Sequence, residues 1–547
     1  MKKKSIWIVL PLVAILAIAA GPVRDKYFEI TKNIEIYTNV YKELNTHYVD
    51  ELDPGQLMRT GIDAMVNSLD PYTNYISESQ IEDYRIFTEA RYNGIGVEIR
   101  LMEDKVVLDE VYEGFPAQKA GLRTGDQLIS INGRPLKADD ANVTYRMMRG
   151  TPGSSVVLEY IRPGNKEVKR VEMTREEVDI PNVPYYRSLD DGVAYIKLSN
   201  FTANATKNIA EAFKKLKAEN KGQLNGLVLD LRGNPGGLLR EAVNIVNLFV
   251  PKDELIVSTR GKSPEHERVY RTMGPAMDTN IPVVILINKN SASASEIVSG
   301  ALQDLDRGVV MGQLSYGKGL VQNTHEVGYN SRLKVTISKY YIPSGRCIQS
   351  VRYENGEPVP LPDSLRQPFR TKNGRTVYDG GGVMPDIKLT HEEQHPLIKQ
   401  LTDEGWILRY IDDFCEGKDS LDQGLDFCFT DYPDFLSFLK KKDFQYEGPV
   451  DKQLKELKKA MEKEGYEKEM AATIKDLETR VEEEQEALFT DYEDQLTRLI
   501  TREIIERYYY NTGIIVYELG SDEEVNAAKE LLLDQDRYNK VLKTKKK

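Results

Sequence analysis

The sequence predicts a multidomain α/β protein in which a small β domain and an α/β core lie between helical N- and C-terminal regions. Residues 179–390 alternate apolar strand-like runs with helical periods, which is typical of a sheet covered by helices. Residues 91–178 contain short β-like runs separated by glycine turns. The length of 547 residues provides for three or four domains at about 150 residues each.

The composition indicates a folded, acidic protein. Lys and Arg total 74 against 86 for Asp and Glu, which gives a net charge of −12. This balance argues against a nucleic-acid partner, because nucleic-acid binders carry a basic face. Hydrophobic residues make up 40% of the chain, too much for a disordered protein. The three cysteines allow at most one bridge, Cys415 to Cys428, and form no C-x-x-C pair, so we expect no metal and no cofactor.

Residues 1–21 predict an export signal. Lysines at positions 2–4 precede an apolar run over residues 6–20, and Gly21-Pro22 follows. This order is typical of a secretory signal, either cleaved or kept as a membrane anchor. The run is shorter than the ~20 residues of a membrane span, which favours cleavage. We therefore expect a protein exported to the cell envelope or periplasm.

Four further regions follow, each with its own pattern. Residues 22–90 have helical spacing as far as Asp70-Pro71, and residues 391–547 are helix-rich and highly charged. In the β domain, residues 91–178, we expect strands at 97–99, 106–111, 127–131 and 156–161. In the core, residues 179–390, we expect strands at 193–199, 226–231 and 283–287 and helices at 203–217 and 238–249. One apolar stripe in the last region comprises Met470, Ile474, Leu477 and Val481.

Three motifs in the β domain have the chemistry of a peptide-binding site. They are Gly94-Ile95-Gly96-Val97, the segment A-G-L-R-T-G-D at 120–126, and a strand that runs into an Asn-Gly turn at 127–133. Glycines let consecutive N–H groups point into one concavity that holds a carboxylate, and a strand edge accepts an extended peptide. A single G-x-G is typical of an ordinary turn, but the three motifs in this order resemble a PDZ domain. The resemblance implies that Gly94, Ile95, Gly96 and Val97 bind a peptide C-terminus.

A serine-rich segment, N-S-A-S-A-S-E at 290–296, lies between an apolar strand and a helix. A nucleophile at this junction meets the helix N-terminus, whose N–H groups favour developing negative charge. Helix capping is the alternative interpretation, because serines followed by glutamate commonly start helices. From these residues alone Ser291, Ser293 and Ser295 are all candidate nucleophiles.

A lysine between two glycines, Lys318, lies in S-Y-G-K-G-L-V-Q at 315–322. An amine acts as a general base near neutral pH when its pKa falls from ~10.4, which desolvation achieves. A phosphate-binding loop is the alternative interpretation, but glycine rather than serine or threonine follows Lys318.

A glycine-rich segment, D-L-R-G-N-P-G-G at 230–237, ends a buried strand and precedes a helix. Its unobstructed N–H groups suit an oxyanion hole. The alternatives are a simple strand-to-helix turn and a phosphate-binding turn.

Together these motifs resemble the C-terminal processing peptidases, or tail-specific proteases, which are serine endopeptidases with a Ser/Lys dyad. The resemblance also covers D-P-Y-T-N-Y-I at 70–76 and Y-Y-I-P-S-G-R at 340–346; Cys347 stands where the family usually has serine. It implies that Ser293 is the nucleophile and Lys318 the base, and that Gln322 positions the amine, on the same face if this stretch is helical. It further implies oxyanion donors at Ala294 and at Gly236 and Gly237.

The resemblance implies an α/β Ser/Lys protease core that needs no metal. Its PDZ domain would capture the exposed C-termini of protein or peptide substrates. A catalytically silent PDZ scaffold of the cell envelope is the alternative function, although Ser293 and Lys318 are both present. A histidine-dependent PDZ protease is a third, but its G-x-S-G-G loop is absent from the sequence. The helical extensions either join copies into a homo-oligomer or cap the core.

Overall fold

The computed structural model describes residues 6–102, 105–138, 141–165, 167–389, 394–418 and 420–543. The side chains of residues 6–26, 82, 83, 87, 88 and 467 are outside this description. The chain divides into two compact units. One contains the residues up to 78 with 322–336 and 353–359, and the other contains 79–321, 337–352 and 360–547.

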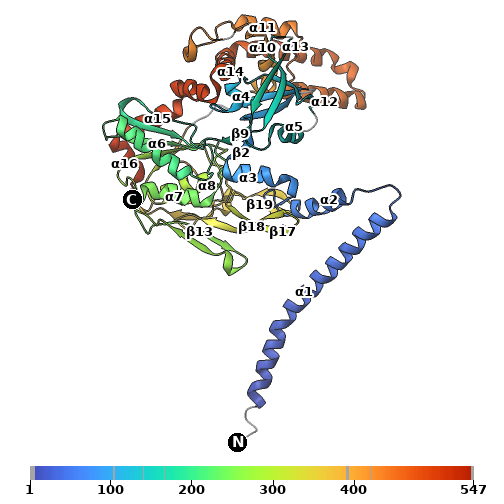
Figure 1. Cartoon of the computed structure of the whole chain (residues 1–547), viewed down its shortest axis with the longest axis vertical. Coiled ribbons are helices and arrows are strands. Elements are labelled where there is room, and N and C mark those ends of the chain that lie inside the picture. Colours follow the sequence, from blue (N-terminus) through green and yellow to red (C-terminus); the bar gives the residue numbers. More distant parts are fainter. Residues whose placement is uncertain are drawn as a thin grey trace. The chain divides into compact units, whose positions relative to one another are not determined.

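The first unit is helical at its start, as the sequence predicts. Its elements are α1 (Ile6–His47), α2 (Pro54–Asn67) and β1 (Asn74–Ile76), and α1 is one long helix (Figure 1). The Asp53 side chain caps α2 by accepting from the Gln56 amide at 3.0 Å. After α2 the chain turns into β1, which pairs antiparallel with Arg332–Lys334 of a later strand. The sequence did not predict this strand, which has only three residues.

The predicted export signal has its side chains outside the described part of the chain. Within the part that is described, no helix combines the length and the apolar character needed to cross a membrane.

The small β domain is a sheet with strand order β3-β4-β5-β7-β8, with β6 paired to β5. Its elements are α3 (Ile81–Glu89), β2 (Arg91–Gly94), β3 (Val97–Met102), β4 (Lys105–Val111), α4 (Pro116–Lys119), β5 (Gln127–Ile131), β6 (Arg134–Pro135), α5 (Ala141–Met148), β7 (Ser155–Ile161), β8 (Val168–Thr174) and β9 (Glu176–Asp179). All four predicted strands are confirmed. The sequence missed β8 because charged residues separate its apolar positions and most of its side chains are exposed.

The α/β core contains a six-stranded sheet of order β10-β11-β12-β15-β16-β23. These strands are β10 (Tyr185–Ser188), β11 (Val193–Lys197), β12 (Gly226–Asp230), β15 (Val283–Ile287), β16 (Val309–Gly312) and β23 (Ile387–Lys388). From β11 to β23 the pairs are parallel, and only β10 runs antiparallel to its neighbour. The predicted α/β fold class is confirmed, because strands β11, β12 and β15 coincide with the predicted apolar runs.

Helices cover both faces of this sheet, and alternate residues of each strand point to opposite faces. Helices α6 (Ala205–Glu219), α7 (Leu239–Phe249) and α8 (Ala294–Asp304) pack on one face, against residues such as Leu227 and Leu229 of β12. The other face, which includes Val228, is covered by α15 (Glu523–Leu533) and α16 (Gln535–Leu542). Helices α15 and α16, although far along the chain, therefore complete the α/β core.

A second sheet and two hairpins were not predicted. They comprise β13 (Leu255–Gly261), β14 (Arg268–Arg271), β17 (Leu320–Gly328), β18 (Ser331–Tyr341), β19 (Val351–Glu354), β20 (Glu357–Pro360), β21 (Pro368–Arg370) and β22 (Thr376–Tyr378). Most of their side chains are polar or exposed, and none has the continuous five-residue apolar run of β15. The apolar start of β13 at residues 255–257 and the alternation of Leu333, Val335 and Ile337 with polar residues in β18 are the signals that could have found those two strands.

The C-terminal region is helical, as predicted, around a core rich in aromatic side chains. Its helices before α15 are α9 (Pro396–Asp403), α10 (Trp406–Phe414), α11 (Tyr432–Lys441), α12 (Pro449–Glu464), α13 (Glu467–Asp491) and α14 (Glu493–Ser521). The apolar stripe predicted on α13 is only partly buried, since Ile474 is covered while Met470 and Leu477 are exposed. Cys415 and Cys428 are both free, so the conceivable bridge between them is not formed.

The Y-Y-I-P-S-G-R motif has a structural basis in Arg346, whose side chain is almost completely buried. Its guanidinium lies 2.9 Å from Asp304 Oδ1 and donates to Gln303 Oε1 at 2.7 Å. We expect Arg346→Met to lower the free energy of unfolding by about 3–5 kcal/mol, because Asp304 is left as an uncompensated buried charge. Urea unfolding measures this change. The exposed Arg352→Met should shift stability by less than about 0.5 kcal/mol, and equal effects for the two variants would contradict the assignment.

Candidate active site

The three core motifs meet at one edge of the parallel sheet. The segment 230–237 follows β12, the serine segment follows β15, and the lysine segment follows β16. These strands are adjacent and parallel, so their carboxyl ends open at the same edge, where α/β proteins bind ligands. Topology therefore gathers segments that lie up to about ninety residues apart in the sequence.

The structure distinguishes the three candidate serines by their surroundings. Ser291 and Ser295 are completely buried, and their hydroxyls donate to Leu231 O at 2.8 Å and Asn234 O at 2.9 Å. Ser293 is partly exposed and stands at the N-cap of α8 with φ 54° and ψ −111°. A non-glycine residue rarely adopts this backbone conformation, which is characteristic of strained functional positions. Of the three serines, Ser293 is the one that is not buried.

Glu296, one turn into α8, joins the serine and lysine segments. Its side chain is completely buried. One carboxylate oxygen accepts from the amides of Ser293 at 2.8 Å and Lys318 at 2.9 Å. The other accepts from Ser315 Oγ at 2.5 Å and the Gly317 amide at 2.7 Å. A single carboxylate thus fixes the backbone on both sides of the proposed dyad.

Two opposing effects set the pKa of Glu296. Burial raises its pKa to about 7, and the four donated hydrogen bonds oppose that rise. All four partners are donors, so the ionised carboxylate satisfies them, whereas a protonated carboxyl would lose acceptor capacity.

Tyr340 links the same two segments through their carbonyl groups. Its buried hydroxyl lies 3.1 Å from Ser293 O and also contacts Lys318 O. Together Glu296 and Tyr340 fix both the N–H and the C=O of each residue of the proposed dyad. The sequence motifs include Tyr340 but assign it no role, and they indicate Glu296 only as part of a helix cap. The helix-capping interpretation is also correct, since Glu296 accepts from the N-cap amide of Ser293.

The predicted oxyanion donors are not equivalent. The Gly236 amide departs from the prediction, because it already donates to Asn234 Oδ1 at 2.9 Å. The amides of Gly237 and Ala294 have no hydrogen-bond partner among the described residues. Gly236 has a different role: at φ +101° a Cβ there would lie 2.8 Å from Ser293 Cβ and 2.9 Å from the Ala294 amide. Glycine at this position keeps space open beside the serine.

The predicted position of Gln322 needs a correction. The stretch that follows Lys318 is the strand β17 and not a helix, so the helical condition for placing Gln322 beside the amine is not met. The glutamine side chain donates to Thr336 Oγ1 at 3.2 Å. Thr336 in turn donates to Asp70 at 3.2 Å, and Asp70 also accepts from the amides of Tyr72 and Thr73 at 2.9 Å. The D-P-Y-T motif therefore supports Gln322.

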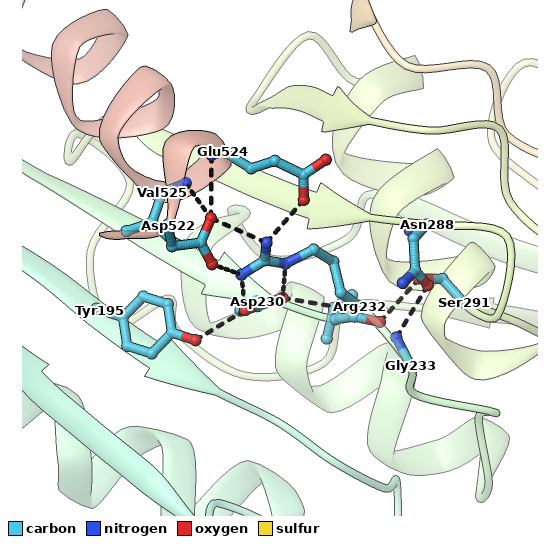
Figure 2. A network of polar contacts seen from close by, with 10 residues as sticks. Tyr195, Asp230, Arg232, Gly233, Asn288, Ser291, Asp522, Glu524 and Val525 are labelled. Carbon is cyan, nitrogen blue, oxygen red and sulfur yellow. Dashed lines mark hydrogen bonds and ion pairs between the residues drawn. The ribbon is translucent and has the colours of Figure 1, made fainter. Parts of the chain in front are cut away.

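Arg232, within the glycine-rich motif, connects this motif to the C-terminal helix α15, as Figure 2 shows. It donates to Asp230 at 2.6 Å, to Asp522 at 2.7 Å and to Glu524 at 2.7 Å. Asp522 also caps α15 by accepting from the amides of Glu524 and Val525. Burial is the largest single effect on Asp230 and opposes its ionisation, but the charge of Arg232, its hydrogen bonds and the charge of Lys197 together outweigh burial and lower the pKa of Asp230. The network holds the start of the glycine-rich segment against the last part of the chain.

The next residue of this segment is also held. The Gly233 amide donates to Asn288 Oδ1 at 2.9 Å, next to the serine segment (Figure 2). Among the described residues no group of three or more His, Cys, Asp or Glu side chains is arranged to hold a metal ion.

In the β domain the four predicted residues form one loop. Gly94 ends β2, Gly96 has φ +83°, and Val97 begins β3. The Ile95 carbonyl accepts from Ala117 at 2.8 Å, while the amides of Ile95 and Gly96 have no hydrogen-bond partner among the described residues. The loop thus presents two amides, as a carboxylate-binding site requires.

Comparison with known proteins identifies the family. The model described as peptidase family S41 matches residues 192–355, the PDZ domain model matches 93–173, and a model described as probable PDZ-protease, C-terminal helical domain, matches 397–532. The carboxy-terminal-processing protease of Bartonella bacilliformis is 34% identical over 322 residues, which cover 58% of this chain and 73% of that protein. This chain belongs to the S41 family of carboxy-terminal processing proteases.

A second curated relative agrees with this assignment, and a solved structure is also similar to part of the chain. The carboxy-terminal processing protease CtpB of Bacillus subtilis is 31% identical over 338 residues, covering 61% of this chain and 69% of that protein. The solved photosystem II D1 C-terminal processing protease has 25% identity and a TM-score of 0.35, and covers 64% of this chain and 92% of that one. The resemblance seen in the motifs is confirmed, and the chain is a serine-type protease with a PDZ domain and a C-terminal helical domain.

Replacement of Glu296 tests its role as the link between the two segments. In Glu296→Gln an NH₂ group replaces one of the two accepting oxygens and faces N–H or O–H donors. We expect kcat on an unfolded polypeptide to fall by at least about 100-fold, because small displacements of reacting groups cost that much. The exposed Glu267→Gln is the control. A kcat within threefold of the unmodified enzyme would contradict the role.

The same variant has a pH signature. The folded-state pKa of Glu296 is raised from 4.5 to about 7, so the folded chain binds this proton more tightly than the unfolded chain. Stability from this group is present below about pH 4.5 and is lost as the pH rises to about 7. We expect Glu296→Gln to flatten the pH dependence of the unfolding free energy in this window, and an unchanged slope would contradict it.

Proposed function

We propose that this chain is an exported serine endopeptidase that cleaves protein substrates at or near their C-terminal tails, with Ser293 as nucleophile and Lys318 as general base. The observation that carries the proposal is the shared carboxylate of Glu296, which binds the backbone amides of both residues. The exposure of Ser293 and the burial of Ser291 and Ser295 support the choice of nucleophile.

The proposed reaction proceeds by acyl transfer. Ser293 Oγ attacks the scissile carbonyl carbon while the Lys318 amine takes the hydroxyl proton. The tetrahedral oxyanion accepts hydrogen bonds from the amides of Gly237 and Ala294, aided by the N-terminus of α8. Lys318 then protonates the leaving amine. In the second half of the reaction water attacks the acyl-enzyme while Lys318 takes its proton, and Lys318 returns that proton to Ser293 Oγ as the acid product leaves. The family resemblance alone supports a role for Gln322 in orienting the amine, since the stretch is a strand and not a helix.

The PDZ domain supplies the preference for tails in this proposal. The Ile95 and Gly96 amides, together with Val97, would hold the terminal carboxylate, and the edge of β3 would pair with the preceding residues of the substrate. Substrates would therefore be proteins with exposed, apolar C-termini. The basic and apolar segments of residues 1–21 support export to the cell envelope.

Substitution of the dyad tests the chemistry. We expect Ser293→Ala and Lys318→Ala each to abolish cleavage of an unstructured polypeptide, with at least about a thousandfold loss in kcat. Fragment mass spectrometry measures cleavage, and circular dichroism verifies the fold. Ser299→Ala, which removes another buried hydroxyl of α8, and the surface variant Lys289→Ala should retain activity. Full activity in either dyad variant would overturn the mechanism.

Substrate termini test the proposed selection of tails. A polypeptide with a free C-terminal carboxylate should be cleaved with a lower KM than the same polypeptide carrying a C-terminal amide, because the amide lacks the charge. Equal rates and equal KM values would remove tail capture from the proposal while leaving the protease chemistry intact.

A further inference from the structure

Side chains of the PDZ domain itself form hydrogen bonds with the sheet edge at which a peptide would pair. In the described sheet β3 pairs with β4 on one side only, so its other edge can accept a peptide strand. Val97 and Ile99 lie two residues apart, and their N–H groups therefore point to the same edge. These are groups to which an added strand and its terminal carboxylate would bind.

Two tyrosine hydroxyls accept hydrogen bonds from these N–H groups. Tyr92 Oη accepts from the Val97 amide at 3.1 Å and lies 3.4 Å from the Val97 carbonyl oxygen. Tyr145 Oη, from α5, accepts from the Ile99 amide at 3.0 Å. In a peptide complex the Val97 amide would donate to the terminal carboxylate of the peptide. The Ile99 amide would donate to one of its backbone carbonyls.

Both tyrosines are held in place. The Arg149 guanidinium lies over their rings, 5.6 Å from the centroid of Tyr92 and 5.2 Å from that of Tyr145. Tyr145 also donates to Glu98 Oε2 at 2.5 Å. Burial raises the pKa of both hydroxyls above the usual range, so they remain neutral at physiological pH. Their hydrogen bonds to the edge are therefore those of uncharged phenols.

We propose that Tyr92 and Tyr145 set the affinity and selectivity of the PDZ groove, because their hydroxyls occupy the edge amides that a C-terminal peptide must take over. The inference rests on the proposed capture of C-terminal tails. In the unliganded groove the two hydroxyls already accept hydrogen bonds from the Val97 and Ile99 amides. A bound peptide therefore replaces these hydrogen bonds with its own.

The exchange favours a free C-terminus. An ionised carboxylate forms hydrogen bonds roughly twice as strong as those of a neutral acceptor, so it can displace the Tyr92 hydroxyl from Val97 and also engage Ile95 and Gly96. A C-terminal amide, or an internal segment of a chain, offers only neutral acceptors and gains little over the phenols. The tyrosines thereby reject segments that lack a free tail.

Peptide binding to the full-length chain tests this inference. The Ser293→Ala background prevents turnover, and the probe is a fluorescently labelled ten-residue peptide with apolar C-terminal residues, prepared as the free acid and as the amide. Fluorescence anisotropy gives Kd for Tyr92→Phe and Tyr145→Phe. Each loses a competing hydroxyl, so we expect free-acid binding to tighten about fivefold, equivalent to about 1 kcal/mol. Tyr160→Phe, a buried tyrosine of β7, should leave Kd unchanged.

The outcomes separate this inference from the proposed function. Tighter binding by the two variants, with free acid preferred over amide, supports both. A preference for the free acid with unchanged or weaker binding by Tyr92→Phe and Tyr145→Phe overturns the inference and leaves tail capture standing. No preference for the free acid in any variant overturns tail capture, and the inference with it.

Hydrogen exchange provides a measurement with every tyrosine intact. In the Ser293→Ala protein the amides of Val97 and Ile99 should exchange slowly before any peptide is added, because the two hydroxyls already protect them. Fast exchange of the Val97 and Ile99 amides in the unliganded protein, with protection only after the free-acid peptide is added, would overturn the inference.

Discussion

The proposed active site depends on one buried carboxylate. Glu296 accepts the amides of Ser293 and Lys318 on a single oxygen, so the distance between the two backbone segments is fixed by the size of that acceptor. Its other oxygen fixes Ser315 and Gly317, which holds the glycine-flanked loop in shape. Removal of this charge from water is costly, and burial raises the pKa of the group accordingly. The four hydrogen bonds to the carboxylate offset only part of this cost.

The scaffold around this carboxylate combines distant parts of the chain. Parallel strands β12, β15 and β16 deliver the glycine, serine and lysine segments to one edge. The C-terminal helices α15 and α16 cover the second face of the same sheet, and Asp522 and Glu524 hold Arg232 at the start of the glycine-rich segment (Figure 2). Helices α15 and α16 are thus part of the protease core and support the segment that contains a proposed oxyanion donor, Gly237.

The sequence predicted the features that depend on local pattern. The apolar runs of β12 and β15 are buried on both faces, so their continuous apolar residues predict each strand. The serine segment lies between a strand and a helix, as the sequence predicts. The sequence did not predict β17, whose side chains are mostly polar or exposed. Signals were present for two other strands, since β13 begins with apolar residues 255–257 and β18 alternates Leu333, Val335 and Ile337 with polar residues. The sequence also could not show that the Gly236 amide donates to Asn234, or that the hydroxyls of Tyr92 and Tyr145 accept hydrogen bonds from the edge amides of β3. Those facts depend on side-chain contacts that spacing does not encode.

The choice of Ser293 as the exposed nucleophile, activated by Lys318, is the claim on which the rest depends. Labelling with a fluorophosphonate, followed by mass mapping of the modified peptide, tests it most directly. The expected result is one adduct, on Ser293, which forms much more slowly in Lys318→Ala. An adduct on Ser291 or Ser295, or equal labelling rates with and without the lysine, would contradict the proposed dyad.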